Sequence, residues 1–172
     1  MTSTKYEELQ ALTKKYGEET LVFYEYVRAI GPQIVTAYNE YLGGPKRAAN
    51  AVPPDGEFEP DVDYNDSAFD DWEHSTKYLK SISMGICTEI GNQSDEGATW
   101  VRTLIKFQPS DGAVILLTGN SGKKVYLQDD LQAVMDDVCE LIFQDTREAF
   151  SLELDEARGR SQIGFAPNPR PS

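Results

Sequence analysis

The sequence has few of the residues that carry enzymatic chemistry. Its 172 residues include one histidine, His74, and two cysteines, Cys87 and Cys139, which are not spaced as a CxxC pair. A catalytic triad would have to be built around His74, and no nucleophile-elbow motif accompanies it. A zinc site of ordinary spacing needs more histidine or cysteine than this chain offers. We therefore predict a non-enzymatic protein with no metal or cofactor, whose cysteines are reduced and buried.

Long apolar runs are also missing. The longest, AVILL at 113–117, is far shorter than the roughly 18 residues that a membrane span needs. The N-terminal sequence MTSTKYEELQALTKK lacks the apolar region of a secretory signal. The length fits one domain that can fold without disulfides. We expect a soluble, cytoplasmic protein that does not associate with membranes.

Basic residues are missing from two segments, which gives the chain an uneven charge. Residues 55–73 carry nine acidic residues and no Lys or Arg, and residues 129–156 carry ten acidic residues and one Arg. Each segment has a net charge of −9, against −13 for the whole chain, so the remaining residues are net positive. Such a field repels nucleic acid and speeds the encounter with cationic partners. The alternative is that these acids serve solubility alone.

The stretch DVDYNDSAFDDWE, residues 61–73, begins with alternating acids and is similar at first sight to a calcium-binding loop. An EF-hand loop has acids or Asn at positions 1, 3 and 5, Gly at position 6 and Glu at position 12. Counted from Asp61, position 6 is Asp66 and position 12 is Trp72. The sharp turn and the bidentate ligand are both lost, so we predict no calcium site.

Two other interpretations of this stretch remain open. In the first, Asp66 or Ser67 caps a short helix over residues 67–75, and the acids are a solvated helix entry. In the second, the stretch binds a basic partner, with its aromatic side chains as anchors. The candidate partner-binding residues come from this stretch and from the C-terminal acidic segment: Asp61, Asp63, Tyr64, Asp66, Phe69, Asp70, Asp71, Trp72, Glu73, Asp136, Asp137 and Glu140.

The N-terminal segment has the pattern of a long helix. Apolar and small residues recur at alternating steps of three and four between Tyr6 and Tyr41, which places them on one helix face. Ser3 or Thr4 can cap the helix start, with Glu7 completing a capping box. Because proline removes a backbone donor and clashes with the preceding turn, Gly31-Pro32 is expected to divide the segment into a helical pair or kink it.

From about residue 78 the apolar period changes to two, which predicts strands over residues 80–90, 99–107, 113–118 and 123–127. The turn sequences between them are short, and short turns favour an antiparallel meander. After Asp129 or Asp130 the period returns to that of a helix.

These elements together predict an α+β fold, with an N-terminal helical pair, a four-stranded antiparallel meander and a long C-terminal helix packed on the sheet. We expect a helical arm at residues 1–44 and a proline- and acid-rich linker at 45–65. The sheet and C-terminal helix then occupy 66–158 and form a single domain with the arm, and residues 159–172 form a flexible tail.

In bulk composition the chain resembles two broad classes of protein: immunity proteins that neutralise toxins, and small acidic α+β chaperones of secreted effectors. The leading hypothesis is an inhibitor or immunity protein that uses its acidic surface to engage a basic protein, such as a toxin or a nucleic-acid-handling protein, without binding nucleic acid itself. The alternative is a homodimeric secretion or assembly chaperone. It is motivated by Leu21 and Val22, which lie off the main stripe and widen the apolar face of the N-terminal helix. An enzyme with an unfamiliar site is a third possibility.

Overall fold

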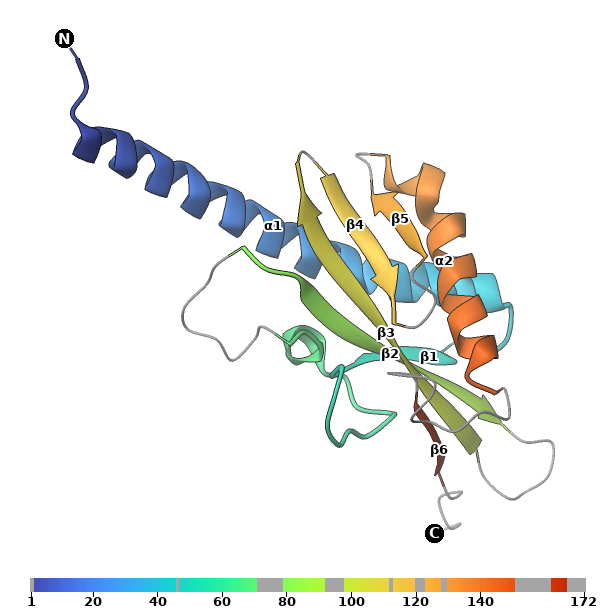
Figure 1. The fold of residues 1–172 in the computed structure, drawn as a ribbon. Coiled ribbons are helices and arrows are strands. Elements are labelled where there is room, and N and C mark those ends of the chain that lie inside the picture. The colour runs from blue at the N-terminus through green and yellow to red at the C-terminus, as the bar shows by residue number, and fades with distance from the viewer. Residues whose placement is uncertain are drawn as a thin grey trace.

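The computed structural model describes residues 2–45, 47–70, 79–91, 98–111, 113–119, 123–127, 130–150 and 162–166. It has one antiparallel sheet and two helices, as Figure 1 shows. The predicted α+β class is therefore confirmed. The expected helix over residues 67–75 and the candidate residues Asp71, Trp72 and Glu73 lie wholly or mostly outside the described residues.

The sheet contains more strands than the four that were predicted. The predicted meander corresponds to β2 (Ile82–Gly91), β3 (Ala98–Ser110), β4 (Ala113–Thr118) and β5 (Lys124–Leu127), which pair in chain order. A further strand, β1 (Ala49–Val52), pairs with β2, and β6 (Gln162–Ala166) pairs with β3. Both additional strands fall in ranges that were expected to be a linker and a tail, so the prediction of a four-stranded sheet is wrong.

The N-terminal segment forms one helix, α1 (Lys5–Leu42), and not the predicted pair. It begins with the predicted capping box: Thr4 Oγ1 accepts from the Glu7 N–H at 3.2 Å, and the Thr4 N–H donates to Glu7 Oε2 at 2.7 Å. It ends at Gly43, whose φ of 67° is the left-handed conformation that glycine adopts at helix ends.

The helix continues through Pro32 because its apolar face is buried on both sides of the proline. Phe23, Val27 and Ile30 precede Pro32 in the core, and Ile34 and Tyr38 follow it. A proline inside a helix costs about 3 kcal/mol. Burying one large apolar side chain contributes about 1.5–3 kcal/mol, so packing against the sheet outweighs the cost of the proline.

The second helix, α2 (Leu131–Glu148), packs against α1 and against β3, β4 and β5. Its inward side chains, among them Met135, Val138 and Ile142, join the same core as the apolar face of α1. This confirms the prediction of a C-terminal helix packed on the sheet. No helix in the described part of the chain is both long and apolar enough to cross a membrane.

Candidate partner-binding surface

The two faces of the sheet have different coverings. Side chains alternate along a strand, so Ile86 and Thr88 of β2 point toward the helices, while Cys87 and Glu89 point to the other face. Register places Arg102 of β3 opposite Cys87, and this face is crossed by residues 53–61. The acid-rich range that was expected to be a linker therefore packs on the sheet.

Arg102 and Phe58 hold this segment in place. The Arg102 side chain is buried, and its Nη1 donates to the carbonyl oxygens of Pro53 at 3.3 Å and Gly56 at 2.8 Å. The guanidinium lies 4.6 Å from the centre of the Phe58 ring, which meets the Trp100 ring edge-on at 4.7 Å. Burial lowers the pKa of Arg102, and the nearby carboxylate of Asp55 opposes this shift. We call Arg102 and Phe58 the clamp. It combines hydrogen bonds from a charged donor with aromatic and cation–π contacts.

Further contacts hold the segment to strand β1. Arg47 Nη2 donates to Asp63 Oδ1 at 2.5 Å and to Asn50 Oδ1 at 3.0 Å. Asn50 Nδ2 in turn donates to the Pro60 carbonyl at 3.1 Å. The hydroxyl of Tyr64 accepts from the backbone N–H of Glu59 at 2.8 Å.

The acidic side chains of this segment all face solvent. We call residues 55–63 the acidic segment, and its five carboxylates are exposed: Asp55, Glu57, Glu59, Asp61 and Asp63. Asp63 forms an ion pair with Arg47. The fold therefore displays a row of carboxylates on a segment that the sheet already orders.

A sixth carboxylate joins the acidic segment from strand β2. Glu89 is partly buried, and burial raises the pKa of its carboxyl. The neighbouring Asp61 raises that pKa further, through a hydrogen bond and through its negative charge. Two like charges held together are unfavourable.

Sequence reasoning identified only part of this surface. Asp61, Asp63 and Tyr64 were predicted, whereas Asp55, Glu57, Glu59 and Glu89 were not among the candidates. Asp55, Glu57 and Glu59 belong to the charged range 55–73, and they lie within the predicted linker at 45–65. The signal that was available is the alternation of acids with Gly56, Phe58 and Pro60, which is typical of a chain with one packed side and one solvated side.

The remaining candidates near this segment have different surroundings. Asp66 is exposed on the short 3-10 helix η1 (Asn65–Ala68). Phe69 is only 3% exposed and pairs with Met84 as an isolated bridge, so it belongs to the core and presents no surface to a partner. Asp70 is exposed, and its Oδ1 accepts from the Ser83 N–H at 3.0 Å.

The second acidic group lies on α2. Asp136, Asp137 and Glu140 are exposed on its outer side. Glu140 accepts a hydrogen bond from the Tyr41 hydroxyl, which lowers the pKa of Glu140 and raises that of Tyr41 to about 12. Because α2 covers the opposite sheet face from the acidic segment, the predicted residues form two separate surfaces.

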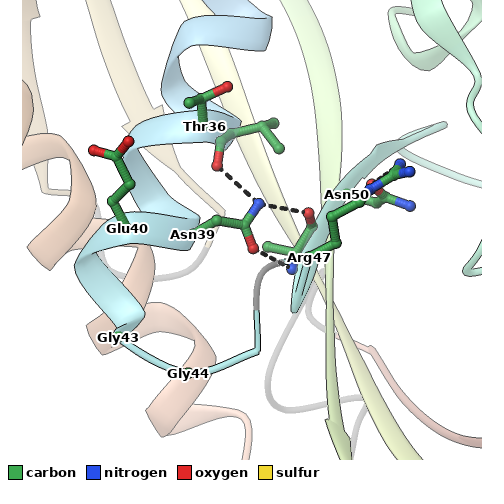
Figure 2. Close-up of a pocket in the computed structure, with 9 residues that line it drawn as sticks. Thr36, Asn39, Glu40, Gly43, Gly44, Arg47 and Asn50 are labelled. Atoms are coloured by element: carbon green, nitrogen blue, oxygen red, sulfur yellow. Dashed lines mark hydrogen bonds between the residues drawn. The ribbon is translucent and has the colours of Figure 1, made fainter.

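A pocket lies between the end of α1 and strand β1, and Figure 2 shows its lining. It has a volume of about 640 Å³. Asn39 crosses its wall, accepting from the Ala49 N–H at 2.8 Å and donating to the Ala49 carbonyl at 2.9 Å. These bonds replace those of a neighbouring strand along the edge of β1. The lining has no histidine or cysteine, and Arg47 is engaged with Asp63.

The cysteines are free and buried, as predicted. Burial raises the pKa of Cys87 to about 12 and that of Cys139 to about 11. Neither thiol ionises near neutral pH, so neither is an activated nucleophile. Within the ranges that the structure describes, no three His, Cys, Asp or Glu side chains form a group able to hold a metal ion.

The fold and this surface define an α+β protein with one antiparallel sheet, and the face opposite α1 and α2 carries the acidic segment. Comparison with protein families, with curated proteins and with solved structures finds no match for the chain.

Proposed function

We propose that this chain is a non-enzymatic, cytoplasmic binding protein of the inhibitor or immunity type, which engages a basic protein through the acidic segment. The observation that supports this proposal most directly is the clamp of Arg102 and Phe58, which holds exposed carboxylates on the sheet. A segment that is ordered before binding loses less entropy when a partner docks. A basic toxin or a nucleic-acid-handling protein has the complementary charge.

The pair formed by Asp61 and Glu89 is the expected centre of the contact. A Lys or Arg side chain from the partner would interact with both carboxylates and relieve their mutual repulsion. Charge pairs at an interface accelerate association and select the partner. The acidic surface also repels nucleic acid, so a partner that handles nucleic acid would be bound directly and not through its substrate.

A matched pair of triple variants tests this proposal. One variant neutralises the acidic segment (Glu57→Gln, Glu59→Gln, Asp61→Asn), and the other neutralises the outer side of α2 (Asp136→Asn, Asp137→Asn, Glu140→Gln). Both remove three negative charges. A labelled peptide rich in Lys and Arg serves as the probe, and fluorescence anisotropy measures its affinity.

The first variant should weaken binding by about tenfold, since exposed ion pairs contribute about 0.2–1 kcal/mol each. The second should change the affinity by less than about twofold, and binding by the unmodified chain should fall steeply with added salt. Equal losses in both variants would mean that the probe senses only net charge. Binding that ignores salt would contradict electrostatic capture.

A homodimeric secretion or assembly chaperone is the second candidate function. One observation favours it: the first half of α1 carries apolar side chains that are exposed. That surface can bind a partner or another copy of the chain.

A further inference from the structure

The first half of α1 extends beyond the edge of the sheet, as Figure 1 shows. Its apolar side chains are largely exposed: Tyr6 by 70%, Leu9 by 61%, Leu12 by 62% and Tyr16 by 45%. The Tyr16 hydroxyl accepts from the Leu79 N–H at 2.7 Å, and the residue remains partly exposed. We call Tyr6, Leu9, Leu12 and Tyr16 the arm stripe.

The arm stripe continues the helix face that the sheet buries further along. The buried face runs from Thr20 through Phe23 and Val27 to Tyr38, in steps of three and four residues. Stepping back from Thr20 by the same spacing reaches Tyr16, Thr13, Leu9 and Tyr6. The same face is therefore packed against the sheet in one half of α1 and uncovered in the other.

We propose that a second copy of this chain covers the arm stripe, with the two α1 helices antiparallel about a two-fold axis. This inference uses a different surface from the acidic segment and does not depend on a basic partner. A two-fold interface brings the same patch of both copies together, so the patch must be complementary to itself.

The sequence of the arm meets this requirement. In an antiparallel pair, Tyr6 of one copy lies in a layer with Tyr16 of the other, and Leu9 with Thr13. On one flank of these layers Leu12 meets Leu12 of the second copy at the axis. On either side of the axis, Lys5 of one copy lies opposite Glu19 of the other, which gives two pairs of opposite charge.

The parallel alternative lacks these matches. A parallel pair places Lys5 opposite Gln10 and Glu19 opposite Tyr24 of the second copy, so no opposite charges meet. A parallel pair would also be blocked sterically. From Thr20 onward the same face of each helix is already packed against its own sheet. In the antiparallel pair, Thr20 of the second copy lies beside the N-terminus of the first helix. The sheet of the second copy therefore lies beyond the end of the first helix and does not clash with it.

The size of this contact predicts a weak dimer. The arm stripe and its flanks would bury on the order of 1,000 Å² in total, the lower end of specific interfaces. We therefore expect a monomer–dimer equilibrium that depends on protein concentration.

Sedimentation velocity over a concentration series tests this inference. The double variant Leu9→Glu/Leu12→Glu should be monomeric at every concentration. The matched control, Leu21→Glu/Val22→Glu, changes two residues that are 59% and 64% exposed on other sides of the same helix and should leave dimerisation unchanged. Circular dichroism checks that both variants retain the helix.

Charge reversal tests the antiparallel arrangement. Lys5→Glu and Glu19→Lys should each weaken dimerisation several-fold, and the double variant should restore it, because the two opposite-charge pairs then re-form with exchanged signs. Lys5 and Glu19 also pair within their own helix, with Glu8 at 3.3 Å and Lys15 at 3.8 Å. The unmodified chain and the double variant are therefore compared by circular dichroism as well.

Three results would overturn the inference. A chain that is monomeric at all concentrations does not use its arm stripe to pair with a second copy. Loss of the dimer in the Leu21/Val22 control places the interface elsewhere. Failure of the double charge reversal to restore dimerisation contradicts the antiparallel pairing.

Discussion

At the level of single residues, Asp61 and Glu89 bring two carboxyl groups into contact on the surface. Burial is the larger cause of the raised pKa of Glu89, and the adjacent Asp61 adds to it. A carboxyl group whose pKa is raised by folding lowers the stability of the folded state once it is ionised. Surfaces that bind partners often retain such unfavourable groups.

Replacing Glu89 with Gln should stabilise the isolated protein at pH 7 by about 0.5 kcal/mol, the usual limit for surface changes. Gln is uncharged and can still donate a hydrogen bond to Asp61. Because the folded-state pKa is raised, the penalty fades as pH falls through that pKa and is absent below about 4.3, the ordinary value for Glu. Urea unfolding of both proteins from pH 4 to pH 8 measures the difference.

The Asp61→Asn background provides the control for this substitution. If repulsion between the two carboxylates contributes to the effect, the stabilisation by Glu89→Gln should be smaller once Asp61 is uncharged. A stabilisation that does not change with pH would contradict the role assigned to the charge of Glu89.

At the level of elements, Gly31 lets Phe69 pack closely against α1, and the helix does not end at this glycine. A Cβ at this position would lie 2.7 Å from Phe69 Cζ and 3.4 Å from Met84 Sδ. Phe69 is buried, so its ring has little room to move. Gly17 in the same helix has no atom within 4 Å of such a Cβ.

Replacing the two glycines with alanine should therefore change the free energy of unfolding in opposite directions. Gly31→Ala should destabilise the fold by about 1–2 kcal/mol, since overpacking of about 1–3 kcal/mol exceeds the gain in helix propensity. Gly17→Ala should stabilise it by up to about 1 kcal/mol. Denaturant unfolding in dilute solution measures both, and stabilisation by Gly31→Ala would show that Phe69 does not pack where the structure places it.

Sequence patterns identified β2 to β5 and α2 because these elements have clear apolar periods. The strand β1 was missed because its sequence, ANAV, has small and polar residues. It becomes a strand through its pairing with β2, which lies more than thirty residues away, and with the Asn39 side chain, ten residues before Ala49. The acidic segment has the composition of a linker, and its sequence does not show its attachment to the sheet because Arg102, which holds it, lies more than forty residues away.

At the level of the whole molecule, the proposed surfaces differ in what drives binding. The acidic segment, on the sheet face opposite α1 and α2, is charged and exposed to solvent. The arm stripe on α1 is apolar and extends beyond the sheet. Because they are separate, one chain can dimerise through its arm and still present an acidic segment on each copy.

Salt should therefore act on the two associations in opposite directions. Two copies with a net charge of −13 repel each other, and salt screens this repulsion within a Debye length of about 10 Å at 0.1 M. Raising NaCl from about 0.05 M to about 0.5 M should strengthen dimerisation several-fold, although the two pairs of Lys5 and Glu19 lose a little. The same change should weaken binding of the basic peptide at least about tenfold. Sedimentation and anisotropy on one preparation measure both, and a dimer that weakens with salt as the peptide complex does would place charged groups, and not the arm stripe, at its interface.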